Sequence, residues 1–199
     1  AIPRYCHKNP PQLSCSGFFK RKRENVVNYA EIKNCDIANG PGVRVSLFVS
    51  GCTHHCKVCF NQVAWDFDYG QPFTQQTVEK ILDMLKPDYI RGLSLLGGEP
   101  MEPQNRGTVL SLVKKVRERY PQKTIWCYTG YHFDRDLLRW MEEGDPVITE
   151  LLPLLDVIVD GEFIEERKNL RLAFRGSENQ RILDVQLSLR EKCGKLLAI

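Results

Sequence analysis

Three closely spaced cysteines are the residues in this sequence best suited to hold a metal centre. Cys52, Cys56 and Cys59 follow the pattern CxxxCxxC. This spacing predicts three thiolates on one tight loop, close enough to share a metal centre. Iron–sulfur clusters are held by cysteine thiolates, and a cubane usually takes four of them. A loop with three cysteines would therefore leave one iron without a protein ligand and free to bind a substrate.

A structural zinc site is an alternative interpretation of the same cysteines. Histidines near closely spaced cysteines are common zinc ligands, and His54 or His55 could supply a fourth one. The three cysteines by themselves leave the two kinds of metal centre open.

A second signal is the turn at Gly97, Gly98, Glu99 and Pro100, which follows an apolar run at 93–96. Glycines after a strand let backbone amides and carbonyls approach a ligand closely, because no Cβ intervenes. Alone, these four residues are also compatible with a plain turn. Their position in the next β/α unit after CxxxCxxC favours a ligand loop.

The composition describes an ordinary globular chain of 199 residues, with 42% hydrophobic and 27% charged residues. A net charge of +3 is too small to indicate a nucleic-acid partner. We find no apolar run long enough to span a membrane and no apolar core of a signal peptide. The 8 cysteines lack the regular spacing of a disulfide framework. We therefore expect a cytoplasmic protein that binds neither nucleic acid nor membranes.

Strands alternating with helices predict one α/β domain over residues 27–190. Strands are expected at 29–32, 43–49, 90–96, 124–128, 155–159 and 181–185. Helices are expected from an N-cap at Thr74, around 109–116, from a cap at Asp134 to 141, and near 147. Four or five parallel units fall short of the eight of a closed barrel. The expected fold is an open, partial (β/α) barrel with its ligand loops at the carboxyl ends of the strands.

The two ends of the chain differ from this domain. Residues 1–26 contain three prolines, a basic run at 20–23 and no apolar period, so we expect a disordered and dispensable extension. Cys6, His7 and Cys15 in it match no common zinc pattern. Residues 191–199 are expected to form a C-terminal tail. Arg44 lies at the start of a central strand, and its position alone is compatible with a surface cation.

CxxxCxxC followed by a strand ending in Gly-Gly-Glu-Pro resembles the radical S-adenosylmethionine (SAM) superfamily. From about Asn28 to about Leu189, the chain resembles the activating enzymes of anaerobic ribonucleoside-triphosphate reductase. The motifs that carry this resemblance are NGPGVR at 39–44, LFVSGC at 47–52, GQPFT at 70–74, Trp126, TGY at 129–131, VDG at 159–161 and RGSxNQ at 175–180. Val58 departs from the aromatic residue found there in many superfamily members, although this activase group often has a small residue at that place.

The resemblance implies a [4Fe-4S] cluster on Cys52, Cys56 and Cys59 that cleaves SAM reductively to methionine and a 5′-deoxyadenosyl radical. It implies that the backbone around Val58, Cys59 and Phe60 contacts the adenine side of SAM. It also implies that Arg44 helps to order the loops around the cluster. Gly98, between Gly97 and Glu99, would hold the methionine amino group, and a side chain at Gly98 would push against it. No catalytic acid or base is expected, because the cofactor supplies the difficult step.

The implied activity is that of a radical SAM oxidoreductase that places a glycyl radical on the anaerobic reductase. Reduced flavodoxin is the expected electron donor. One alternative is an activase of another glycyl-radical enzyme, such as pyruvate formate-lyase, although the sequence lacks the second cysteine-rich insert of the larger activases. The other alternative is a zinc-binding interaction module without catalysis.

Overall fold

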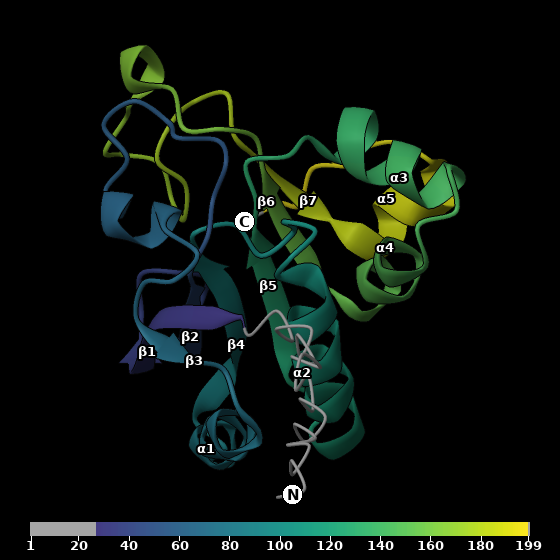
Figure 1. Cartoon of the computed structure of the whole chain (residues 1–199). Coiled ribbons are helices and arrows are strands. Elements are labelled where there is room, and N and C mark those ends of the chain that lie inside the picture. Colours follow the sequence, from purple (N-terminus) through teal and green to yellow (C-terminus); the bar gives the residue numbers. More distant parts are fainter. Residues whose placement is uncertain (1–26, 199) are drawn as a thin grey trace, which may run out of the picture.

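The computed structural model describes residues 27–198 as a mixed α/β domain around one open, seven-stranded sheet (Figure 1). The order of the strands is β3-β1-β2-β4-β5-β6-β7. The strands are β1 (Asn28–Asp36), β2 (Val43–Val49), β3 (Gln71–Pro72), β4 (Ile90–Gly97), β5 (Thr124–Tyr128), β6 (Val157–Asp160) and β7 (Arg181–Asp184).

The centre of this sheet is parallel and its edges are antiparallel. Strands β2, β4, β5 and β6 run parallel to their neighbours, whereas β1, β3 and β7 are each antiparallel to the strand beside them. The expected α/β class is confirmed, and the sheet is not closed. The last expected strand is antiparallel, so it does not extend the series of parallel units.

In the described part of the chain, five α-helices connect and cover the strands. They are α1 (Gln75–Leu85), α2 (Arg106–Arg119), α3 (Leu138–Glu142), α4 (Pro146–Leu151) and α5 (Val185–Glu191). Thr74 caps α1 as expected, because its side chain accepts the N–H of Thr77 and the Thr77 side chain accepts the N–H of Thr74. Within residues 27–198, no helix combines the length and apolar character needed to cross a membrane.

The expected cap at Asp134 is wrong. A π-helical turn, η2 (Phe133–Leu137), precedes α3, and its N-cap residue His132 makes no side-chain capping bond. The Asp134 carboxylate instead accepts the N–H of Gly194 at 2.5 Å and pairs with Arg181 at 2.8 Å. A long-range contact therefore outweighs the local capping preference of this aspartate.

Alternate residues of the central strands face two different environments. Leu47, Leu95 and Ile125 belong to the main apolar core, which also contains the buried faces of α1, α2 and α4. Successive side chains of a strand point to opposite faces. The other face carries polar residues such as Ser46 and Ser94, which are also fully buried. One face therefore supplies the hydrophobic core, and the other is available for a polar site.

Arg44 lies on this polar face and is fully buried, so the surface-cation interpretation is wrong. Its guanidinium donates to the Ser94 hydroxyl at 2.7 Å and to the carbonyls of Leu93 and Thr124 at 2.8 and 2.9 Å. The Ser94 hydroxyl in turn donates to the Asn39 carbonyl at 2.5 Å. Burial lowers the pKa of Arg44 to about 10, so it stays charged at neutral pH. Arg44 joins three central strands to the segment at Asn39.

The end of the chain packs on the sheet. The N–H of Leu197 donates to the Ile182 carbonyl, and the N–H of Asp184 donates to the Lys195 carbonyl. The residues expected to form a separate tail thus pair with β7 as far as they are described. The extension at 1–26, with Cys6 and Cys15, lies outside the described residues.

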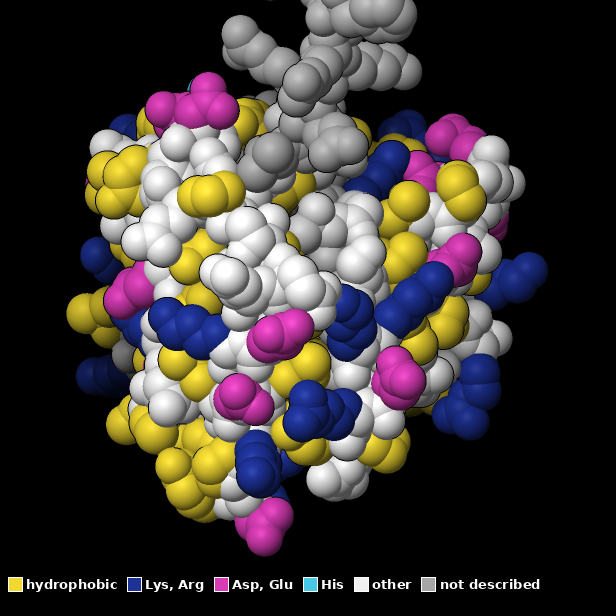
Figure 2. Space-filling model, turned by 60° about the horizontal axis from the view of Figure 1, so that its bottom comes forward, with side chains coloured by type: hydrophobic (Ala, Val, Ile, Leu, Met, Phe, Trp, Pro, Cys, Tyr) yellow, Lys and Arg dark blue, Asp and Glu magenta, His cyan; other side chains and the backbone are white. Residues whose placement is uncertain are grey.

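The face at the bottom of Figure 1 is turned forward in Figure 2. Lys and Arg side chains on this face are interspersed with Asp and Glu side chains, and hydrophobic side chains lie between them (Figure 2). No single sign of charge dominates this face.

Candidate functional site

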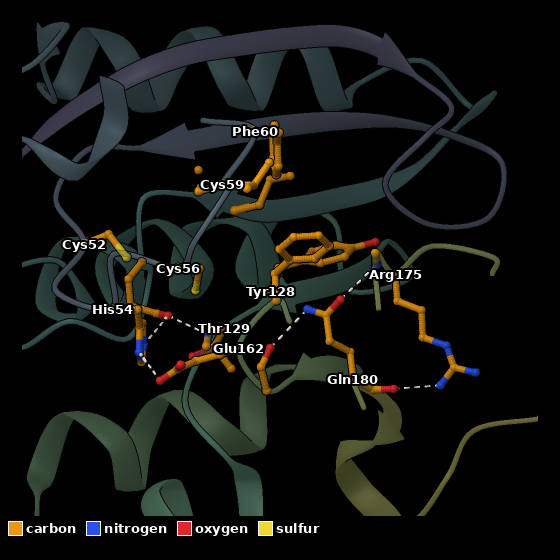
Figure 3. Close-up of a pocket in the computed structure, with 18 of the residues that line it drawn as sticks. Cys52, His54, Cys56, Cys59, Phe60, Tyr128, Thr129, Glu162, Arg175 and Gln180 are labelled. Carbon is orange, nitrogen blue, oxygen red and sulfur yellow. Dashed lines mark hydrogen bonds and ion pairs between the residues drawn. The ribbon is translucent and has the colours of Figure 1, made fainter. Parts of the chain in front are cut away.

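A cavity of about 490 Å³ lies where the loops after β2, β4, β5 and β6 meet (Figure 3). Ligands of open α/β sheets bind at the carboxyl ends of the strands, and small-molecule sites span about 300–1,000 Å³. Every residue predicted for the site lines this one cavity: Cys52, Cys56, Val58, Cys59, Phe60, Gly97, Gly98 and Glu99. The structure therefore brings together two motifs that are about 40 residues apart in the sequence.

The loop that carries the three cysteines begins directly after β2. Its base is closed by hydrogen bonds from the N–H of Gly51 to the Ala64 carbonyl and from the N–H of Cys52 to the Trp65 carbonyl. Within the loop, His55 and Val58 adopt left-handed backbone conformations, with φ of 49° and 57°. These turns let the chain reverse direction within a few residues and place all three cysteines on one cavity wall.

The three thiols are free, and their arrangement is not that of a preformed metal site. Cys52 is buried, whereas Cys56 and Cys59 are half-buried. Across the part of the chain that the structure describes, no group of three or more His, Cys, Asp or Glu side chains converges as metal ligands would. The donor set fits an iron–sulfur cluster in its chemistry, and metal sites often complete their geometry only on binding.

The surroundings of Cys52 and Cys56 favour their protonated thiols in the absence of a cation. Burial raises the pKa of Cys52 to about 12, although the backbone N–H groups of His54 and His55 act in the opposite direction. Burial also raises the pKa of the Cys56 thiol. A bound metal would supply the positive charge that stabilises the thiolates.

His54 lies between two carboxylates and is a poor candidate for a zinc ligand. Its Nε2 atom is 3.2 Å from Glu99 Oε2, and its Nδ1 atom is 3.1 Å from Glu162 Oε1 (Figure 3). Burial lowers the pKa of His54, but hydrogen bonds and charges from both carboxylates outweigh it and raise the pKa. Both ring nitrogens already lie beside a carboxylate, which leaves neither of them free for a metal. His55 stacks on Trp65, with ring centroids 4.7 Å apart.

Glu99 uses its buried carboxylate to connect loops. Oε1 accepts the N–H of Met101 at 2.8 Å, and Oε2 accepts the N–H of Gly130 at 2.7 Å. Its backbone N–H donates to the Gly51 carbonyl at 2.8 Å. Together with His54, this residue joins the loops after β2, β4 and β5, so its side chain positions the cavity walls.

Gly98 is required by the packing of the protein itself. A Cβ at this position would lie 2.5 Å from the Gly51 carbonyl oxygen and 2.7 Å from that of Ala64. Both oxygens belong to the base of the cysteine loop. The expectation that a side chain here would first meet a bound ligand therefore needs revision, because it would first displace this loop.

Several cavity residues were not identified from the residue pattern. Tyr128 ends β5 and lines the cavity, and its hydroxyl is buried without a hydrogen-bond partner among the described residues. Part of the irregular segment between β6 and β7 forms a further wall, contributed by Lys168, Asn169, Leu170, Leu172, Phe174 and Arg175. The position of Tyr128 at the end of a predicted strand is a signal that could have identified it as a cavity residue. The irregular segment has no hydrophobic periodicity that could have done so.

Comparison with known proteins places the chain within a recognised family. A family described as a 4Fe-4S single cluster domain matches residues 38–183. A Vibrio cholerae protein named anaerobic ribonucleoside-triphosphate reductase-activating protein is 46% identical over 156 residues, which cover 77% of this chain and 96% of that relative. Proteins of the same name from Enterobacteria phage T4 and Escherichia coli K12 are 43% and 40% identical. These matches cover 78% and 77% of this chain and 93% and 96% of the relatives.

Proposed function

Because the chain belongs to the family of anaerobic ribonucleoside-triphosphate reductase-activating proteins, with its 4Fe-4S single cluster domain, we propose that it generates a glycyl radical on such a reductase. The bound groups would supply reductive cleavage of SAM by a [4Fe-4S] cluster to methionine and a 5′-deoxyadenosyl radical. One observation carries this proposal: the CxxxCxxC cysteines and the Gly97–Glu99 backbone line the same cavity.

Cys52, Cys56 and Cys59 would hold the cluster in this proposal. Val58 and Phe60 flank Cys59 and are 51% and 84% exposed, so both offer apolar surface on the cavity wall. Such surface suits the adenine of SAM, which stacks on apolar and aromatic groups. The backbone of Gly97, Gly98 and Glu99 would face the methionine end.

Other residues would hold these groups in position. Glu99 and His54 fix three loops relative to one another. Arg44 does not line the cavity, but it supports Asn39, which does, through the Ser94 hydroxyl. No side chain is needed as a general acid or base, since the protein orients the cofactor and the cofactor carries the reaction.

The proposed domain is of the radical SAM type, and it includes the residues after 190 that pair with β7. Its sheet is open, which supports a macromolecular substrate that reaches the cavity from the side. Reduced flavodoxin in an anaerobic cytoplasm is the proposed source of the electron. The relatives are named as activating proteins of the anaerobic reductase, which favours this enzyme over pyruvate formate-lyase as the target.

Anaerobic reconstitution with iron and sulfide tests this function. The reconstituted protein should be brown, contain about four irons per chain, and release methionine and 5′-deoxyadenosine from SAM when a reductant is added. A colourless protein that retains zinc and leaves SAM intact would instead establish the zinc-binding alternative.

A further inference from the structure

Residues 167–175, between β6 and β7, form a segment that we name the basic arm. Its sequence, RKNLRLAFR, places four cations among apolar residues. The preceding turn, η4 (Glu165–Arg167), is tied to the cysteine loop through Lys57, whose Nζ lies 2.9 Å from Glu165 Oε2 and 3.5 Å from Glu166 Oε1. In Figure 1 the yellow-green segment that contains the arm lies beside the blue cysteine loop. Residues of the arm and of this loop both line the cavity.

The positive charges of the basic arm are not neutralised within the described part of the chain. None of its cations, Arg167, Lys168, Arg171 and Arg175, lies within ion-pair distance of a carboxylate there. The acids nearest in sequence have other partners. Glu165 and Glu166 pair with Lys57, Glu162 pairs with His54, and Glu178 accepts from the Asn169 amide.

The basic arm also exposes apolar surface at the cavity. Leu170 is 89% exposed and lines the cavity together with the half-buried Leu172 and Phe174. An exposed apolar group bordered by cations fits a partner that offers an apolar side chain between acidic ones. Because these residues face the cavity itself, a chain that contacts them also enters the space where the cofactor is proposed to bind.

On the basis of the proposed function, we propose that the basic arm binds the reductase segment that carries the target glycine. This segment is acidic and has an apolar residue that lies beside the arm. An acidic electron-donor protein would also be attracted by the cations. It would need only to approach the cluster from outside, whereas Lys168, Leu170 and Arg175 lie along the cavity. The cavity-facing position therefore favours the substrate segment.

The double charge reversal Arg167→Glu/Arg171→Glu tests this docking surface. Both side chains are exposed, and neither lines the cavity, so the cofactor groups are left in place. The matched control is Lys80→Glu/Lys86→Glu, which makes the same change of charge on and just after α1. A third variant, Leu170→Ser, removes the exposed apolar group and leaves every cation of the arm unchanged.

The measurement is the Kd between each reconstituted protein and the purified anaerobic reductase, at low and at high salt. Arg167→Glu/Arg171→Glu should bind about tenfold more weakly at low salt and lose most of the salt dependence, because exposed charges act mainly through screened attraction. Leu170→Ser should weaken binding about fivefold at both salt concentrations. The control should stay within about twofold of the wild type.

Two results would overturn the inference. The first is that both arm variants bind the reductase with the same Kd as the wild-type protein, although the wild-type protein forms the glycyl radical. This result would leave the proposed function intact. The second is unchanged reductase binding together with lost reduction of the cluster by reduced flavodoxin, which would assign the arm to the electron donor. A wild-type protein that forms no glycyl radical with dithionite as reductant would instead contradict the proposed function itself.

Discussion

The imidazole Nε2 of His54 lies 3.2 Å from the carboxylate Oε2 of Glu99, and this ion pair connects the CxxxCxxC loop to the Gly-Gly-Glu-Pro loop. Both side chains are almost completely withdrawn from solvent, at 9% and 2% exposed. The Glu99 carboxylate also accepts two backbone N–H groups, so it forms the centre of the contacts that hold the cavity walls together.

Replacing His54 by alanine should lower the free energy of unfolding of the metal-free protein by about 1–3 kcal/mol, because Glu99 would remain buried without its cation. His54→Gln keeps a hydrogen-bond donor and should restore part of the loss. Urea denaturation of both variants and the wild type checks this. Equal unfolding midpoints for all three proteins would show that the ion pair does not hold the loops.

Gly98→Ala should disturb the cysteine loop before it affects any ligand. Its Cβ would lie 2.5 Å from the Gly51 carbonyl oxygen, so the loop base must shift. We expect a loss of about 1–3 kcal/mol in unfolding free energy and a reduced iron content after reconstitution. Gly107→Ala is the control, because a Cβ there meets nothing within 4 Å, and alanine in α2 should be neutral or stabilising. Full iron loading with weaker SAM binding in Gly98→Ala would instead favour direct contact between this loop and the cofactor.

Each of Cys52→Ala, Cys56→Ala and Cys59→Ala should lose the cluster and all cleavage of SAM. All three line the cavity, whereas Cys35 is exposed on β1 and is absent from the cavity lining. Cys35→Ala therefore serves as the control with unchanged iron and sulfide content. Normal iron loading of Cys56→Ala would remove this residue from the proposed ligand set.

Asp134 should contribute to the acid sensitivity of the fold. Burial raises its pKa, but the N–H of Gly194 and the charge of Arg181 outweigh burial and hold the pKa below 3.8. Because the folded-state pKa is the lower one, this carboxylate stabilises the fold above pH 3.8, and the contribution is lost as the pH falls through the folded-state value. Asp134→Asn should be less stable than the wild type at pH 7 and should lose less stability on acidification. Urea titrations between about pH 3 and pH 7 check this, and parallel pH profiles would contradict it.

The central strands were predictable because their sequence signals are local. β5 has the expected bounds, since Thr124–Tyr128 consists of β-branched and aromatic residues apart from Cys127 and lies between clear breaks. The burial of Arg44 and its hydrogen bonds were not predictable from local sequence signals. Its hydrogen-bond partners, Ser94 and Thr124, come from two other strands, and no local pattern marks an arginine as buried.

The cavity was predictable only in part for the same reason. Cys52 and Gly98 lie in motifs whose spacing indicates a ligand loop, and they do meet at one cavity. Leu170 and Leu172 lie in a segment without periodicity and outside the quoted motifs, and only the fold brings them to the cavity. One partner of His54 is Glu162, which is more than 100 residues away in the sequence, so no local pattern indicates this contact.

Electron paramagnetic resonance tests the proposed activation most directly, on the reconstituted protein mixed anaerobically with the anaerobic reductase, SAM and dithionite. We predict a glycyl-radical doublet that requires all four components and disappears when the target glycine of the reductase is replaced by alanine. The same doublet with that Gly→Ala reductase, or no doublet from a protein that contains the full cluster and cleaves SAM, would contradict the proposed activation of this partner.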